Sequence, residues 1–149
     1  MIRGYFLTRA GRRRPFITAT IELPAFGRSL GVRLLVDTGA DRTVLAPRDA
    51  GRLSRLGVDL EMLPTGRPST GVGGVTQTRT ISAVLTLGAA SIALTLPILE
   101  PPAGQAAVVF PMPSLLGRDI LSRFALFVEE RTGRVLLLEP HEADALALP

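Results

Sequence analysis

The sequence predicts an all-β domain with one or two short helices. Short apolar runs alternate with polar residues at a period of two, which is typical of half-buried strands. Fifteen Gly and twelve Pro separate these runs and favour many short strands over long helices. Aromatic residues make up only 5% of the 149 residues, so we expect the core of a single domain to be aliphatic.

The first elements lead to a carboxylate at residue 37. We expect a short strand over residues 2–8 and a basic loop over 10–15. Residues 16–23 have a period of two and predict a half-buried strand. A turn rich in Gly and Pro over 24–29 precedes an apolar strand over 31–37.

The middle of the chain predicts one helix and two hairpins. A short apolar β run covers 43–45, and 47–56 predicts a helix because Pro suits its first position and Gly follows its last. Residues 64–80 are rich in Gly and Thr and predict an exposed hairpin. Residues 81–87 and 92–98 alternate again and predict a hairpin with one face on the core.

The last third of the chain predicts short elements. We expect a short strand over 106–110 and a short helix within 115–124. Residues 125–128 and 135–138 predict a final hairpin, whose consecutive apolar residues indicate that both faces are covered. Residues 140–149 are expected to be a loose tail.

Composition excludes several kinds of catalytic site. The chain has no Cys and a single His, His141, which lies in the predicted tail. A thiolate zinc site, a cysteine nucleophile and a Ser-His-Asp triad are therefore hard to assemble. Chemistry in this chain is expected to use carboxylates, hydroxyls and backbone groups, with no metal and no cofactor.

The formal net charge is +4, and all seventeen basic residues are Arg. They are scattered along the chain except at residues 12–14, which we interpret as a solvated loop; contact with nucleic acid or anionic lipid is the alternative. No run approaches the roughly 18 apolar residues of a membrane span, and no secretory signal is evident. We expect a cytoplasmic protein with neither a nucleic-acid nor a membrane partner.

Asp37 is the most informative residue of the chain. It follows the apolar run Leu34–Val36, and a buried carboxylate costs several kcal/mol unless it is paired, hydrogen-bonded or protonated. Thr38 supplies a hydroxyl and Gly39 allows a sharp turn. The alternative interpretation is an ordinary Asp-Thr-Gly turn between two strands.

Two sequence blocks now point to a family. Residues 34–45 read Leu-Leu-Val-Asp-Thr-Gly-Ala-Asp-Arg-Thr-Val-Leu, residues 115–121 read Leu-Leu-Gly-Arg-Asp-Ile-Leu, and the glycine-rich hairpin lies between them. This order resembles the retropepsin-like aspartic proteases over residues 16–140. The resemblance implies one domain over 1–149, folded as a closed β-barrel or sandwich with a flap hairpin and ending in a flexible tail.

The resemblance also assigns roles to individual residues. Asp37, Thr38 and Gly39 would be catalytic. Arg118 and Gly117 would support the floor of the site, with Arg118 bridging to Asp41. The residues that would contact a peptide substrate are Ala40, Asp41, Val44, Val72, Gly73 and Gly74.

The family uses two Asp-Thr-Gly turns, and this chain has one. The resemblance therefore implies a homodimer in which Asp37 meets its symmetry mate. Two carboxylates a few ångströms apart share one proton and activate a water for peptide hydrolysis. The predicted helix over 47–56 and the hairpin after residue 124 exceed the minimal viral form and look more like cellular and bacterial members. That hairpin is a candidate for the dimer interface.

Two other functions are compatible with the sequence. A catalytically silent, dimeric peptide-binding or scaffold domain would share the fold, since fold does not imply function. An Arg-rich nucleic-acid binder is the third hypothesis, and a lack of DNA and RNA binding would remove it.

Overall fold

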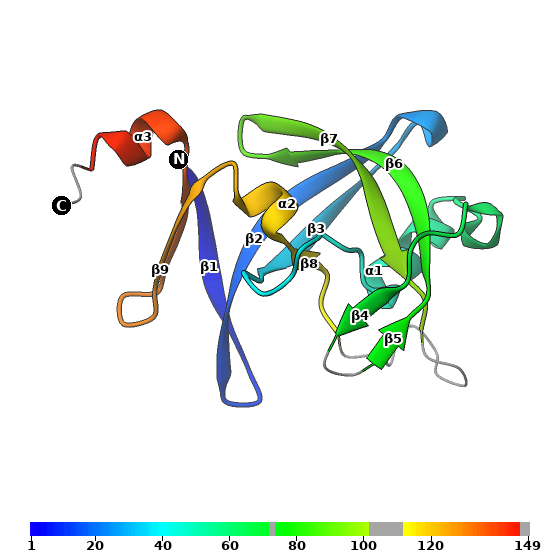
Figure 1. The fold of residues 1–149 in the computed structure, drawn as a ribbon, viewed down its shortest axis with the longest axis horizontal. Coiled ribbons are helices and arrows are strands. Elements are labelled where there is room, and N and C mark those ends of the chain that lie inside the picture. The colour runs from blue at the N-terminus through cyan, green and yellow to red at the C-terminus, as the bar shows by residue number, and fades with distance from the viewer. Residues whose placement is uncertain (72–73, 102–111, 147–149) are drawn as a thin grey trace.

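The computed structural model describes residues 1–71, 74–101 and 112–146 (Figure 1). Within them, an eight-stranded sheet has the order β7-β6-β2-β1-β10-β9, with β3 pairing with β2 and β8, and β4 and β5 form a second sheet. The strands are β1 (Ile2–Arg9), β2 (Arg12–Leu23), β3 (Arg28–Val36), β4 (Ser69–Gly71), β5 (Gly74–Thr76), β6 (Thr78–Leu87), β7 (Ala90–Leu99), β8 (Leu115–Leu116), β9 (Ala125–Glu129) and β10 (Arg134–Leu138). The helices are α1 (Pro47–Arg55), α2 (Arg118–Leu121) and α3 (Pro140–Asp144), with 3-10 turns η1 (Pro24–Phe26) and η2 (Leu60–Met62). None of these described helices has the length and apolar character needed to cross a bilayer.

The predicted all-β class is confirmed, and β2 is the strand that joins its parts. β2 is 12 residues long and pairs antiparallel with β1, β3 and β6. The hairpin predicted from the two alternating runs is β6–β7, paired in register from Thr78↔Leu99 to Leu87↔Ala90. The predicted helix is α1, which ends one residue earlier than expected.

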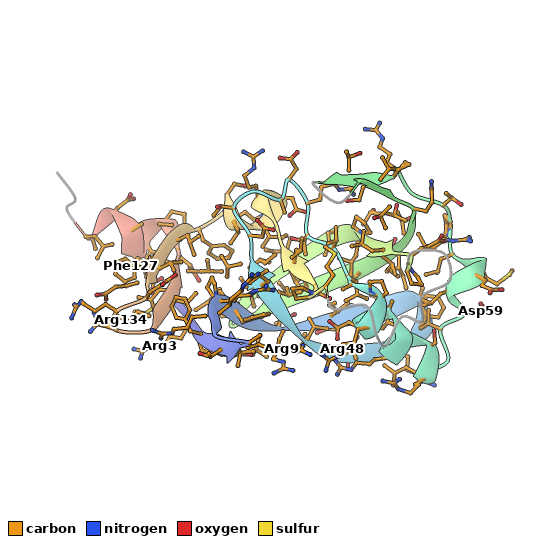
Figure 2. The ribbon with its side chains drawn as sticks, turned by 90° about the horizontal axis from the view of Figure 1, so that it is seen from below. Arg3, Arg9, Arg48, Asp59, Phe127 and Arg134 are labelled. Atoms are coloured by element: carbon orange, nitrogen blue, oxygen red, sulfur yellow. The ribbon has the colours of Figure 1, made fainter. Side chains whose placement is uncertain are left out.

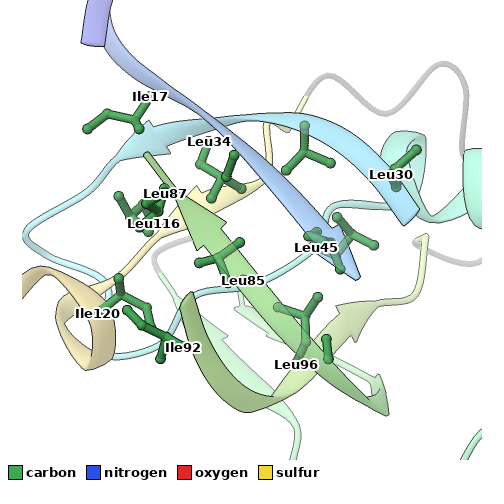
Figure 3. Close-up of a cluster of buried hydrophobic side chains, with 14 of the residues drawn as sticks. Ile17, Leu30, Leu34, Leu45, Leu85, Leu87, Ile92, Leu96, Leu116 and Ile120 are labelled. Atoms are coloured by element: carbon green, nitrogen blue, oxygen red, sulfur yellow. The ribbon is translucent and has the colours of Figure 1, made fainter. Parts of the chain in front are cut away.

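The core is aliphatic, as the composition predicts. Figure 3 shows buried side chains from β2, β3, β6, β7, β8 and α2 meeting in one cluster. Its fully buried members include Ile17, Leu34, Leu45, Leu85, Leu116 and Ile120. Burying one such side chain contributes about 1.5–3 kcal/mol, so this cluster is the main support of the β3–β8 region that carries Asp37.

The basic loop predicted over residues 10–15 is wrong. The turn between β1 and β2 consists of Ala10 and Gly11 alone, both with positive φ (49° and 72°), and β2 begins at Arg12. Two consecutive residues with positive φ match the twist of paired strands, which makes a tight hairpin turn. The three consecutive arginines gave no alternating pattern, so the sequence did not indicate that they belong to a strand.

The C-terminal third differs from the predictions in two further places. Residues 140–144 form α3 rather than a loose tail, because Pro140 occupies the first helical position and Glu139 and Glu142 form a capping box. The final hairpin β9–β10 is present, but β9 is an edge strand, and Phe127 and Val128 are 41% and 42% exposed. Its faces are therefore not both covered.

Two short strands predicted from the sequence are not among the described strands. The β run expected over 43–45 is reduced to isolated bridges, in which Val44 pairs with Leu115 and Leu45 with Ile98. The strand expected over 106–110 lies outside the described residues.

Helix α3 is held to the start of the chain through Glu142. The N-terminal ammonium of Met1 donates a 2.6 Å hydrogen bond to Glu142 Oε1, and the Glu139 N–H donates a 2.9 Å bond to Glu142 Oε2. The ammonium first, and the backbone bond second, lower the pKa of Glu142. A pKa that is lower in the folded than in the unfolded chain stabilises the fold above the ordinary pKa of glutamate. This stabilisation is lost as the pH falls through the lowered pKa.

Glu142→Gln is therefore expected to lower stability slightly at neutral pH and to change it little in acid. Urea unfolding of both proteins, from neutral pH down into acid, measures the difference in their free energies of unfolding. Asp144→Asn is the matched control, because Asp144 lies on the same helix, is exposed, and forms no ion pair with the residues described. Parallel pH profiles for wild type and Glu142→Gln would contradict the prediction.

Candidate active site

Asp37 lies at the end of β3, where the chain leaves the sheet. Its backbone N–H still donates to Leu116 O at 3.1 Å, and its Oδ1 accepts a 2.9 Å hydrogen bond from the Gly39 N–H. The Ala40 N–H donates to Asp37 O at 3.3 Å and closes the turn. The half-buried carboxylate is thereby fixed through one oxygen. In the part of the chain that is described, Oδ2 accepts no hydrogen bond.

The loop after Asp37 wraps around β8. On one side β8 pairs in parallel with β3, with Leu35 opposite Leu115 and Val36 opposite Leu116. On the other side Val44 and Leu115 exchange backbone hydrogen bonds of 3.1 and 3.0 Å. We call residues 37–43 the Asp37 loop. Because β8 is hydrogen-bonded on both edges, it fixes where the Asp37 loop begins and ends.

A buried hydroxyl joins the Asp37 loop to the second sequence block. Thr43 is 1% exposed. Its Oγ1 accepts a 3.0 Å hydrogen bond from the Gly117 N–H and donates a 2.8 Å bond to Asp119 Oδ1, which also accepts the Thr43 N–H at 2.8 Å. We call Thr43, Gly117 and Asp119 the threonine clamp.

Backbone contacts complete the junction. The Arg118 N–H donates to Ala40 O at 2.8 Å, and the Asp119 N–H donates to Asp41 O at 3.1 Å. The start of α2 therefore binds the carbonyls of the Asp37 loop directly. Arg118 Nη2 also contacts Asp41 Oδ1, so the two charges expected to bridge lie together. Both side chains are largely exposed, and an ion pair of this kind contributes at most about 1 kcal/mol.

Several residues that anchor this region were not predicted as site residues from the sequence. In the sequence, Asp119 stands out only as part of the block over residues 115–121, and Thr43 only as part of the predicted β run over 43–45. Ser114 is fully buried, accepts the Ala46 N–H at 2.9 Å and donates to Asp49 Oδ2 at 2.7 Å. A signal was present, since short polar side chains lie beside both apolar blocks. Their pairing could not be predicted, because the partners are 65 or more positions apart in the sequence.

Removing the Thr43 hydroxyl is expected to destabilise the protein. Thr43→Val keeps the shape but leaves the buried Gly117 N–H without an acceptor, which costs about 1–3 kcal/mol. Thr43→Ser retains the hydroxyl and is the matched control. The free energy of unfolding in urea measures both variants. A loss in Thr43→Ser without a loss in Thr43→Val would assign the effect to packing of the methyl group instead.

The other predicted site residues differ in how exposed their side chains are. Thr38 and Gly39 are exposed at the tip of the Asp37 loop, and Ala40 is half-buried. Val44 is only 6% exposed, so little of it can reach a ligand in the single chain. Gly74 begins β5 and is exposed, whereas Val72 and Gly73 lie outside the described residues.

The predicted flap hairpin corresponds to β4 and β5, with Ser69 opposite Thr76 and Gly71 opposite Gly74. Figure 2 shows this hairpin, the loop after β3 and α2 on the same side of the molecule. Within the residues described, no three His, Asp or Glu side chains are placed together to hold a metal ion. Of the residues predicted from the sequence, Asp37, Thr38 and the Asp41–Arg118 pair carry polar side chains on this face.

A strand-rich single lobe with one Asp-Thr-Gly turn locked to a Leu-Leu-Gly-Arg-Asp block defines a retropepsin-like aspartic protease domain. Comparison with protein families agrees: a family described as aspartyl protease matches residues 22–120, about two thirds of the chain. The chain belongs to this aspartyl protease family.

Solved structures show the same fold. A retropepsin-like aspartic protease from Rickettsia conorii is 21% identical, with a TM-score of 0.59, over 90% of this chain and 87% of that one. The EIAV protease in complex with the inhibitor HBY-793 is 24% identical, with a TM-score of 0.53, over 78% of this chain and 92% of that one. A search of curated proteins by sequence finds no significant match. The predicted retropepsin-like fold is thus confirmed.

Proposed function

We propose that the protein is a homodimeric aspartic endopeptidase in which two copies of Asp37 form the catalytic pair. One observation carries the proposal: a half-buried carboxylate stands at a strand end, fixed through Oδ1 by the Gly39 N–H. The chain supplies one such Asp-Thr-Gly turn, so the second carboxylate comes from a second chain.

The chemistry follows from placing two such carboxylates side by side. They share one proton, because two negative charges a few ångströms apart repel strongly. The ionised Asp37 takes a proton from a water molecule held between the pair, and the water oxygen attacks the peptide carbonyl carbon. The protonated Asp37 donates to the carbonyl oxygen as the tetrahedral intermediate forms. Proton transfer to the amide nitrogen then lets the C–N bond break.

The surroundings of Asp37 support this use. Two backbone–backbone hydrogen bonds from α2 and three hydrogen bonds of the threonine clamp that involve a side chain fix the Asp37 loop, so little reorganisation is needed during the reaction. Thr38 is exposed beside Asp37 and is available to bond its counterpart across a two-fold axis. The β4–β5 hairpin lies on the same side and offers backbone groups to an extended peptide, Gly74 among them.

Among the described strands, the free edge of β9 offers a second chain a place to pair. β9 is at the end of the sheet order, and one of its edges has no neighbouring strand among the described elements. Exposed edge strands invite pairing with another chain, and Phe127 and Val128 expose apolar surface there. Antiparallel pairing of β9 with its own copy would satisfy a two-fold axis.

The test is cleavage of a peptide library at several pH values, with the oligomeric state recorded on the same samples. We expect cleavage by the dimer, with loss of activity at both pH extremes because only the singly protonated pair is active. A well-folded dimer that cuts no peptide would support the silent binding domain. A stable monomer would remove the proposed site, since one chain has one carboxylate.

A further inference from the structure

Strand pairing gathers arginines that are scattered in the sequence. Side chains alternate between the two faces of a strand, and residues directly opposite each other share a face. Arg9 lies opposite Arg12, and Leu7 lies opposite Arg14. The same face continues to Arg33 through Thr18 on β2, and to Arg134 through the pairing of Arg3 with Leu136 on β10. We call Arg3, Arg9, Arg12, Arg14, Arg33 and Arg134 the arginine face.

Residues between those of the arginine face point to the opposite face of the sheet. Arg13, between Arg12 and Arg14, turns the opposite way: its guanidinium carbon is 4.9 Å from the centre of the Phe6 ring, and its Nη1 donates to Glu130 O at 2.7 Å. Ile17 and Leu34, on that same opposite face, are buried in the core. The arginine face is therefore the outer face of the sheet.

The arginine face carries a net positive charge. All six arginines are exposed, and none of them forms an ion pair with any residue that the structure describes. The acidic residues on the same face are Glu22 and Glu129, and Glu129 is already bound by Arg131 at 2.9 Å. The charge is therefore available to an anionic partner.

The arginine face also points away from the candidate active site. Figure 2 shows Arg3, Arg9 and Arg134 along one side of the molecule, with the loop after β3 and the β4–β5 hairpin along the other. A partner bound to these arginines leaves Asp37 and the flap hairpin open. This surface is suited to attaching the protein to something rather than to holding a substrate at Asp37.

In place of the expectation from the sequence that the protein has no membrane partner, we propose that the arginine face binds an anionic phospholipid bilayer. The arginines form a two-dimensional array. Arg9 is six positions after Arg3 on β1, a distance of about 20 Å along the strand, and the four strands β10, β1, β2 and β3 span about 14 Å across the sheet. Such an array fits a surface of phosphate groups better than a single polyanionic strand, which needs a linear track. Guanidinium groups bind phosphate in a fork geometry.

Apolar side chains between the arginines favour the same partner. Tyr5, Leu7, Leu35 and Leu136 are half-buried on this face, and Phe127, opposite Leu136, is exposed at its edge. Charged heads combined with apolar stems and rings suit the boundary between lipid headgroups and acyl chains. A nucleic-acid strand would require a platform of exposed aromatic rings, and Phe127 is the single exposed one in the described part of this face.

The test is co-sedimentation of the full chain with vesicles of phosphatidylcholine, with and without phosphatidylglycerol. We expect binding to the anionic vesicles alone, and release when salt is raised from about 0.1 M to about 1 M, which shortens the Debye length from about 10 Å to about 3 Å. Each arginine removed is expected to lower the partition coefficient roughly fivefold, so Arg9→Gln/Arg12→Gln should lower it roughly 25-fold.

Arg67→Gln/Arg123→Gln is the control. The two arginines lie within two residues of β4 and of α2 in the chain, and Figure 2 shows these two elements on the other side of the molecule. The variant removes the same charge and should bind vesicles like the wild type. An equal loss in both double variants would overturn the proposal, because binding would then follow net charge alone. Equal binding to neutral vesicles would overturn it as well. Preferential binding of single-stranded RNA or duplex DNA over anionic vesicles would assign the face to nucleic acid instead.

Discussion

Asp37→Asn is expected to abolish peptide hydrolysis while leaving the fold and the dimer intact. Asn has the size of Asp and its side-chain oxygen can still accept the Gly39 N–H, so the turn after β3 is kept. It can neither take a proton from water nor share one with its partner. Loss of the acid–base pair is expected to lower kcat by about 1,000-fold or more, with a small effect on stability. Steady-state cleavage of a peptide identified from the library measures the change.

The chain offers a closely matched control. Asp59 Oδ1 accepts the Glu61 N–H at 3.0 Å, the same contact to the residue two positions on that Asp37 makes with Gly39. Asp59→Asn therefore tests the same substitution in the same kind of turn, away from the candidate site. We expect it to keep full activity. Comparable losses in the two variants would mean that Asp37 acts through the turn and not through proton transfer.

Mixing wild-type and Asp37→Asn chains tests whether activity needs an Asp37 carboxylate from each of two chains. When wild type and Asp37→Asn are unfolded and refolded together in equal amounts, about a quarter of the dimers carry two Asp37 residues if chains pair at random. Activity per wild-type chain should then fall to about half, because mixed dimers contain one carboxylate. Activity that stays proportional to the amount of wild-type chain would show that each chain works alone and would remove the two-chain site.

Much of the fold could be predicted because its signals are local. The period of two over 16–23, 81–87 and 92–98 predicts β2, β6 and β7, since each strand has one face on the core. Pro47 and Gly57 mark the ends of α1 within two residues. Asp37 could be selected as a candidate because it directly follows an apolar strand, and its predicted role depends on the resemblance carried by residues 34–45 and 115–121.

The predictions from the sequence are wrong or missing where local signals are weak, or where contacts between distant residues determine the structure. The Ala10–Gly11 turn depends on two residues with positive φ, and Ala is seldom found there. Helix α3 depends partly on the contact between Glu142 and Met1, 141 residues away. The arginine face could not be predicted either, because the register of four strands, and not the spacing in the sequence, brings its six side chains together.

The threonine clamp explains why a glycine stands between the Leu-Leu pair and Arg118. Gly117 has an extended backbone with φ of −93°, which any residue adopts, so conformational freedom is not the reason. A Cβ at this position would lie 2.3 Å from the Arg42 carbonyl carbon, 2.5 Å from the Arg42 oxygen and 2.8 Å from the Thr43 nitrogen. These are backbone atoms of the Asp37 loop, which cannot move aside as a side chain can.

Gly117→Ala is therefore expected to push the Asp37 loop away from β8 and α2. Overpacking against fixed atoms costs typically 1–3 kcal/mol, and we expect about 3 kcal/mol here because the contact is with backbone. The hydrogen bonds from Gly117 to Thr43 and from Arg118 to Ala40 would lengthen together. Urea unfolding measures the stability, and amide hydrogen exchange of Arg118 and Thr43 reports the local opening.

Gly31→Ala is the control, because a Cβ on Gly31 meets no atom within 4 Å and its φ is ordinary for a strand. We expect its stability to stay within about 0.5 kcal/mol of the wild type. If Gly117→Ala is destabilised and loses peptide cleavage at a temperature where it remains folded, the position of the Asp37 loop, and not the carboxylate alone, limits activity. If it cleaves normally, the loop tolerates displacement, and the threonine clamp serves stability without positioning Asp37.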